Sequence, residues 1–368
     1  MSPEKKADRF PCPGCSADMQ FDPASGGMKC PFCGTTQALT AAATPGRPAG
    51  IVSHALEEFL SKEGDSHLSP LSAEALQVTC DACGSAVTFE PPEVAGSCPF
   101  CGDALVAQPK AADPLVAPDA VLPASITKEK AQTEVRAWLQ TRWFAPNALK
   151  RLSRQEAISG VYLPFWDYDA DTTTQYTGQR GEHYYETETY TDNDGNTQTR
   201  QVMRTAWHST SGEVSRRFEN ILVPASRSVA ESKLNALEPW GLDALRPYEP
   251  AFLAGFKAQR YQLDLGPGFD KAAASMRPKI EHDVRSDIGG DEQSIDSLNT
   301  EYFNAMFRHL LLPVWIGAYR FQNKVYQVAV NACTGEVQGE RPYSAAKIAM
   351  LVLFVLVLIG LIAVLSHR

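Results

Sequence analysis

The chain has 368 residues, a formal net charge of −9 at pH 7 and 44% hydrophobic residues. This length is sufficient for two or three domains. The acidic balance is that of an ordinary globular body, and it argues against a protein whose overall charge attracts nucleic acid.

Eight of the nine cysteines fall into two copies of the spacing C-x2-C-x14-C-x2-C, and each copy ends in CPFCG. Two cysteines separated by two residues form a knuckle that presents both sulfurs to one metal, and four thiolates satisfy a tetrahedral zinc ion. The spacing therefore predicts two zinc ribbons, each binding one Zn²⁺. The predicted ligands are Cys12, Cys15, Cys30 and Cys33 in ribbon 1, and Cys80, Cys83, Cys98 and Cys101 in ribbon 2.

Three other uses of these cysteines compete with zinc binding. An iron site of the rubredoxin type also uses CPxCG knuckles, and the sequence leaves it open. A redox site of the glutaredoxin type would use one Cys-Pro-Phe-Cys pair, whereas every pair here has a second pair at ribbon spacing. Disulfides fit poorly, because the N-terminal residues do not resemble a signal peptide. The ninth cysteine, Cys333, is expected to be a small buried residue.

Composition divides the chain into segments and predicts an α+β fold with a mostly antiparallel β body. Clusters of Ala, Pro, Ser and Gly separate the ribbons from each other and from the body. The predicted segments are ribbon 1 (1–37), a linker with a short helix near 51–60 (38–77), ribbon 2 (78–104), a proline-rich connector (105–126), the α+β body (127–344) and a C-terminal anchor (345–368).

Within the body, apolar periodicity predicts helices near 127–144, 228–237 and 269–288, with a kink at Pro278. The intervening sequence predicts antiparallel strands, including a hairpin whose turn is Asp192–Asn196. The expected strands are 161–168, 172–176, 184–191 and 197–208, with a last hairpin that joins 326–330 to Val337.

A short motif occurs twice in the body, as Leu163-Pro164-Phe165-Trp166 and as Leu312-Pro313-Val314-Trp315. Proline in a sheet belongs at a strand start or on an edge. Two similar strand entries and a true internal duplication explain the repeat equally well. In either case, we expect both tryptophans to be core residues.

The C-terminal segment contains eighteen residues, 348–365, without a charged or strongly polar side chain. At about 1.5 Å per residue, a helix of this length would span roughly 27 Å, close to the hydrocarbon thickness of a bilayer. This predicts a single-pass, tail-anchored protein. Arg341 and Lys347 before the segment favour a cytoplasmic body at the inner membrane of a bacterium.

Several segments taken together carry a resemblance to a known family. They are the CPFCG ribbon, Trp138-Leu139 with Arg142–Asn147, Gly160–Trp166, Leu312–Trp315, Asn331 with Thr334–Val337, and Gly339–Ser344. From the second ribbon onward, the chain resembles uncharacterised bacterial zinc-ribbon membrane proteins. These are often labelled primosomal replication-restart helicase-like or TFIIB-type zinc-ribbon proteins. The resemblance implies a role near nucleic acid, but the sequence has no G-x-x-x-x-G-K-[ST] loop for ATP.

No H-E-x-x-H, nucleophile elbow or other catalytic motif occurs, so the sequence predicts a protein that is not an enzyme. The predicted function is a membrane-anchored platform that recruits a protein partner. One alternative is a nucleic-acid transaction protein, which would need a basic face. The residues that would supply that face are Arg200, Arg204, Arg216 and Arg217. The other alternative is a thiol oxidoreductase that uses metal-free CPFC pairs. Residues 78–103 contain no Lys or Arg, which disfavours phosphate binding by ribbon 2.

Overall fold

The computed structural model describes most of the chain and leaves several short stretches undescribed. The described residues are 10–39, 50–61, 76–80, 85–89, 95–101, 104–106, 116–146, 158–191, 196–321 and 324–366. The predicted ligand Cys83 and most of the predicted turn at 192–196 lie outside these ranges.

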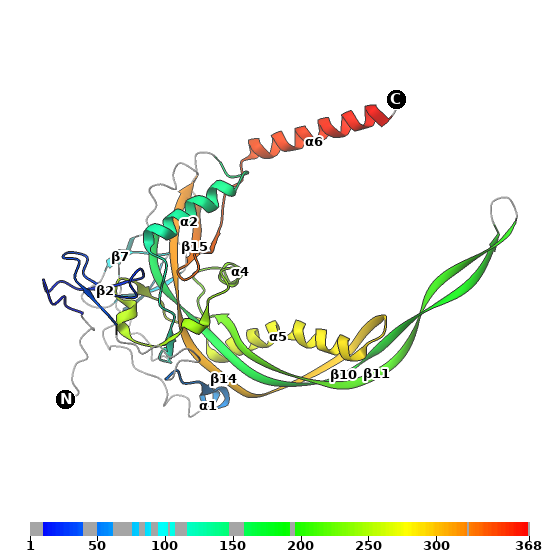
Figure 1. The fold of residues 1–368 in the computed structure, drawn as a ribbon, viewed down its shortest axis with the longest axis horizontal. Coiled ribbons are helices and arrows are strands. Elements are labelled where there is room, and N and C mark those ends of the chain that lie inside the picture. The colour runs from blue at the N-terminus through cyan, green and yellow to red at the C-terminus, as the bar shows by residue number, and fades with distance from the viewer. Residues whose placement is uncertain are drawn as a thin grey trace.

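A long antiparallel sheet forms the body and confirms the mostly antiparallel β body predicted from the sequence. Its main path runs β11-β10-β14-β15-β16. The strands are β10 (Ile158–Thr191), β11 (Thr197–Pro224), β14 (Glu292–Phe321), β15 (Lys324–Asn331) and β16 (Val337–Gly339). Figure 1 shows β10 and β11 continuing as one hairpin far beyond the rest of the body.

Two helices cover parts of this sheet. α2 (Lys128–Thr141) begins after Thr127, whose side chain accepts a hydrogen bond from the Lys130 backbone, and it buries Ala131, Val135 and Leu139. α5 (Leu265–Ile288) continues through Pro278 and lies along β10 and β11. Its buried residues are Leu265, Gly268, Ala272, Met276, Ile280, Val284 and Ile288. The spacing of this buried set is helical, which is why the sequence revealed α5.

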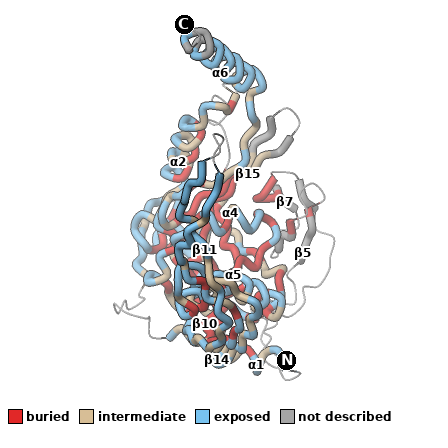
Figure 2. Tube along the Cα trace, turned by 90° about the vertical axis from the view of Figure 1, so that its right-hand side faces the viewer, coloured by how far each residue is buried: buried red, intermediate tan, exposed pale blue. Residues whose placement is uncertain are grey.

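Shorter elements complete the body. The helical ones are α4 (Glu231–Asn235) and the 3₁₀ turns η2 (Leu242–Ala244) and η3 (Pro250–Leu253). The two-residue strands are β9 (Ala120–Val121), β12 (Arg246–Pro247) and β13 (Lys257–Ala258). In Figure 2 the buried residues are concentrated in the body, whereas the outer hairpin is mostly exposed.

Part of the predicted linker belongs to the body sheet. β4 (His54–Ala55) pairs with Met306 and Phe307 of β14, and α1 (Leu56–Leu60) follows directly. The ring of His54 also lies against Phe307, with 5.4 Å between centroids. The helix expected over 51–60 is thus confined to its second half, because the residues before it extend to pair with the sheet.

The two Leu-Pro-x-Trp segments lie side by side in neighbouring strands. β10 and β14 pair antiparallel so that Leu163 faces Leu312. Both prolines lie inside long strands, unlike the predicted strand starts. However, each proline lies one residue before the point where its strand begins to pair with the neighbour on the other side. β10 pairs with β11 from Phe165 onward, and β14 pairs with β15 from Val314 onward. A missing N–H is tolerated at such a local edge.

The C-terminal helix α6 (Ala345–Ser366) extends away from the body (Figure 1). Among the described residues, no helix is both long and apolar enough to cross a membrane. The prediction of a C-terminal transmembrane anchor at 345–368 is therefore wrong. The tail-anchored topology and the placement at the inner membrane depended on that anchor and are wrong with it. The membrane as a partner stays a prediction.

Candidate metal centres

Ribbon 1 brings its four predicted ligands together. Its strands β1 (Gln20–Asp22) and β2 (Gly27–Lys29), between the knuckles, and β3 (Thr36–Gln37), after the second knuckle, form a small antiparallel sheet. The four sulfurs of Cys12, Cys15, Cys30 and Cys33 lie within 4.8 Å of one another. Gly34 follows the closing knuckle with φ = 77°, a conformation that disfavours a side chain. The sulfurs are therefore already grouped as a single metal ion would require.

Ribbon 2 repeats this arrangement in its described part. Its strands pair as two hairpins, β5 (Leu76–Thr79) with β6 (Ala86–Phe89), and β7 (Ala95–Ser97) with β8 (Ala104–Val106). The sulfurs of Cys80, Cys98 and Cys101 lie within 4.8 Å of one another. Both cysteine clusters could hold a metal ion. Cys333 belongs to neither and lies in the turn between β15 and β16.

Hydrogen bonds divide the thiols of ribbon 1 into different acid strengths. The hydroxyl and backbone N–H of Thr35 act on Cys33 and lower its pKa to about 6. The backbone N–H of Ala17 lowers the pKa of Cys15, but hydrogen bonds with Cys30 and Cys33 outweigh it and raise that pKa to about 12. Four crowded thiols resist simultaneous ionisation, whereas a bound cation would stabilise all four thiolates.

Both ribbons are packed into the hydrophobic core of the body. In ribbon 1, the ring of Phe21 meets Phe252 of η3 edge-to-face at 5.5 Å, and the Phe21 N–H donates to the Ala254 carbonyl at 2.9 Å. In ribbon 2, Phe100 joins the core formed by β10 and β14, and Gln327 of β15 donates to its carbonyl at 3.1 Å. A loss of metal that unfolds either ribbon would therefore also remove packing contacts from the core of the body.

The repeated CPFCG motif has two different surroundings. Phe100 of ribbon 2 is 1% exposed, whereas the equivalent Phe32 of ribbon 1 is 81% exposed. Pro13 and Pro31 of the ribbon 1 knuckles are also exposed. The sequence could not distinguish the two phenylalanines, since they occupy the same place in the repeat. Ribbon 2 uses this ring to attach to the body, and ribbon 1 leaves it on the surface.

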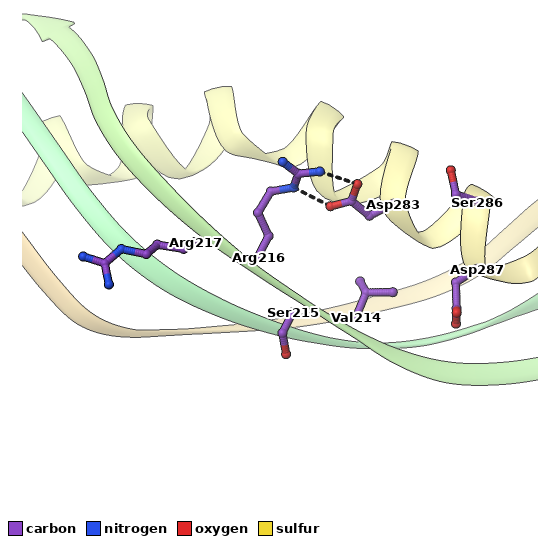
Figure 3. A pocket seen from close by; sticks show the side chains of 7 residues that line it. All are labelled: Val214, Ser215, Arg216, Arg217, Asp283, Ser286 and Asp287. Atoms are coloured by element: carbon purple, nitrogen blue, oxygen red, sulfur yellow. Dashed lines mark hydrogen bonds and ion pairs between the residues drawn. The ribbon is translucent and has the colours of Figure 1, made fainter.

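An open polar groove of about 660 Å³ lies between β11 and α5 (Figure 3). Arg216 points across it and donates to both carboxylate oxygens of Asp283, at 2.5 and 2.6 Å. This ion pair holds the pKa of Asp283 below its usual range. The other lining residues are Val214, Ser215, Arg217, Ser286 and Asp287. Arg216 is matched by Asp283 and Arg217 by Glu219, so neither arginine that lines the groove is a free cation for an anionic ligand.

The four arginines that would supply a basic face are each paired with an acid. Arg216 pairs with Asp283 and Arg217 with Glu219. On the outer hairpin, Arg200 pairs with Glu188, while Arg204 pairs with both Glu186 and Glu188. Their positive charges are therefore locally neutralised.

Sequence reasoning missed a cluster that joins three distant segments. His54 Nε2 lies 2.7 Å from one carboxylate oxygen of Asp119, and the other oxygen accepts the backbone N–H of His309 at 2.7 Å. The ring of His309 packs on Trp166 with 5.0 Å between centroids. No spacing rule could reveal this group, because its members lie far apart in the sequence. It fixes β4 to the body.

His309 makes the stability of the body sensitive to acid. Its Nδ1 lies 3.0 Å from the Val116 carbonyl and therefore carries the proton, while the buried Nε2 has no hydrogen-bond partner among the described residues. Burial lowers the pKa of His309. In the unfolded chain the ring of His309 takes up a second proton at about pH 6.5, whereas in the folded chain burial opposes this protonation. Stability from the neutral ring is thus present above that pH and is lost as the pH falls.

We expect the urea midpoint to decrease as the pH falls below about 6.5. His309→Leu should flatten this dependence, while His208→Leu, at an exposed histidine of β11, should leave it unchanged. Urea titrations on both sides of that pH measure the effect. An unchanged slope in His309→Leu would show that another group is responsible.

Comparison with known proteins finds a distant relative but assigns the chain to no protein family. The chain is similar to "Uncharacterized protein YdjG" of Bacillus subtilis (strain 168), with 26% identity over 347 residues that cover 92% of each chain. No protein-family model matches it, and no solved structure matches it significantly. What defines this protein is therefore its own architecture, two cysteine clusters built into a long antiparallel β body.

Proposed function

We propose that this chain is a non-enzymatic scaffold in which two zinc ions, one in each ribbon, hold the ribbons in place on the β body. Ribbon 1 then recruits a protein partner. Four thiolates fill the coordination sphere of zinc and leave no position for a substrate, as in structural sites. The packing of both ribbons into the core supports the same structural role.

The exposed ring of Phe32 is the single observation that carries the partner-binding role. A large aromatic residue on a rigid knuckle provides buried area at low entropic cost, and such residues dominate the energetics of protein interfaces. The matched Phe100 supports this interpretation, because it shows the same motif packed against a protein surface. We therefore assign to Phe32 a partner with an apolar pocket.

A nucleic-acid role, which the family resemblance implies, is the second candidate. Binding to phosphates depends on clustered cations that release counterions. The pairing of Arg200, Arg204, Arg216 and Arg217 with carboxylates weighs against such a face. A salt-dependent mobility shift with single-stranded DNA at physiological ionic strength would favour this candidate over the scaffold.

A thiol oxidoreductase is the third candidate, and the lowered pKa of Cys33 is the observation in its favour. This activity would require a ribbon without metal, since a zinc-bound thiolate is occupied. Turnover of a dithiol substrate by the metal-loaded protein would support the oxidoreductase and exclude a purely structural ribbon.

The scaffold is tested with the full-length chain carrying a photo-crosslinking amino acid beside Phe32, followed by mass spectrometry of the captured protein. Phe32→Ser should reduce capture at least tenfold, because the anchor is lost. Zinc content and melting temperature should stay unchanged, because the ring is exposed. Trp143→Ser, at another exposed aromatic residue, serves as the matched control and should retain capture. Equal capture by Phe32→Ser and the wild type would contradict the proposal.

A further inference from the structure

The hairpin of β10 and β11 continues past the sheet as a two-stranded arm, defined here as residues 182–191 and 197–206. The last backbone pair between β10 and β14 is Gly181 opposite Glu292, and the side chains of His183 and Thr205 also contact Glu292. Beyond it, ten residue pairs join β10 to β11 alone, from Glu182–Ala206 to Thr191–Thr197. At about 3.3 Å per residue, the arm is roughly 33 Å long. Figure 1 shows it extending beyond the rest of the body.

The two faces of the arm differ in charge, because one carries charged side chains and the other carries uncharged ones. Side chains alternate between the faces along each strand, and directly paired residues share a face. One face carries the charges. Glu182 pairs with Arg180 just inside the arm, and the other four charged residues of this face pair with one another. Arg204 pairs with Glu186 at 2.5 Å, Arg200 pairs with Glu188 at 3.1 Å, and Arg200 also stacks over Tyr190.

The other face, called here the neutral face, has no charged residue outward from Tyr185. Tyr185 and Met203 are a direct cross-strand pair and are 68% and 53% exposed. Threonine and glutamine continue this face toward the tip. Its residues are Tyr185, Thr187, Thr189, Thr199, Gln201 and Met203.

Covering the neutral face is far less costly than covering the charged face. A two-stranded ribbon is only marginally stable in water, so a long exposed one gains from a partner layer. On the charged face, that layer would have to desolvate ion pairs, and the desolvation cost can exceed the Coulombic gain. On the neutral face, it would bury Tyr185 and Met203 and leave threonine hydroxyls within reach of hydrogen-bond partners.

We propose that the neutral face binds the neutral face of a second copy of this chain, so that two arms stack in a two-fold symmetric dimer. A strongly charged partner would gain nothing from a surface without charge, whereas an identical face matches it. Two-fold symmetry makes one surface serve both partners. The net charge of −9 favours contact through the arms. They can keep the acidic bodies farther apart than the Debye length of about 8 Å at physiological ionic strength.

This dimer goes beyond the scaffold role and does not depend on Phe32. It is tested by placing a photo-crosslinking amino acid in the full-length purified chain at position 185 or at position 184. Tyr184 and Tyr185 are exposed neighbours on opposite faces, so each is the control for the other. We expect a crosslinked dimer from position 185 and little from position 184.

Sedimentation velocity over a dilution series gives the second readout. Tyr185→Arg and Met203→Arg should each raise the dimer dissociation constant at least tenfold, because each would bury an unpaired charge. Tyr184→Arg should leave that constant unchanged. A wild-type monomer at all concentrations would overturn the proposal. A dimer that ignores Tyr185→Arg, or that responds equally to Tyr184→Arg, would also overturn it by placing the contact elsewhere.

Discussion

Cys30→Ser in the full-length chain is expected to remove the metal from ribbon 1 and to destabilise the β body as well. Phe21 and Met28, on the strands of ribbon 1, are buried in the same hydrophobic core as Trp315 and Tyr162 of the body. If ribbon 1 unfolds, both side chains leave this core. Burial of each stabilises the fold by about 1.5–3 kcal/mol, so the body should lose on the order of 3–6 kcal/mol.

Chemical denaturation followed by tryptophan fluorescence measures this loss, because Trp315 reports on the core of the body. Cys333→Ser is the matched control, since this thiol belongs to neither cluster. Its midpoint should remain close to the wild-type value. If the Cys30→Ser body unfolds at the wild-type midpoint, ribbon 1 is an independent module, as its spacing alone would suggest.

Trp166→Ala and Trp315→Ala should each lower the free energy of unfolding by about 3–5 kcal/mol, the usual effect of truncating a large core aromatic. Trp166 is fully buried, and its Nε1 donates to the Leu263 carbonyl at 2.8 Å. Trp315 packs on Phe256, and its Nε1 donates to the Ile126 carbonyl at 2.7 Å. Each truncation would leave a cavity and a carbonyl without its donor.

Urea unfolding followed by circular dichroism compares these variants with Trp143→Ala. Trp143 is exposed, so its truncation should change stability by no more than about 0.5 kcal/mol. If Trp166→Ala and Trp315→Ala both unfold like the wild type, the packing account fails. The two tryptophans would then become candidates for a binding site.

The elements with strong local signals were the predictable ones. The cysteine spacing identified the ligands of ribbon 1 and three of ribbon 2 that the structure groups, because knuckle geometry is set within a few residues. The apolar period of α5 was equally readable. The strands were predicted only in part, because 161–168, 172–176 and 184–191 belong to the single strand β10 and β11 continues past the predicted end at 208. Each of these patterns depends on the chain's own regular geometry and needs no distant partner.

Features that depend on distant contacts escaped prediction. β4 and β9 are two residues long, and only pairing with distant strands makes them strands, β4 with β14 and β9 with β12 and β14. The positions of Pro164 and Pro313 became explicable once the neighbouring ladders were known. The different exposure of Phe32 and Phe100 depends on whether the body packs against each knuckle, so it could not be predicted from two identical CPFCG motifs.

The C-terminal segment was the main error. Its apolar run predicted a transmembrane helix, and α6 is indeed a helix that leaves the body. The described residues nevertheless contain no helix long and apolar enough to cross a membrane. Hydropathy here predicted the secondary structure, but the inference from helix to membrane anchor failed.

The metal content of the purified full-length chain tests the central claim most directly. Elemental analysis should give about two zinc ions per chain, and X-ray absorption should place four sulfurs at about 2.3 Å from each ion. Cys30→Ser should lose one of the two ions and retain the other. One ion or none in the wild type with its thiols free, or iron in place of zinc, would contradict the account.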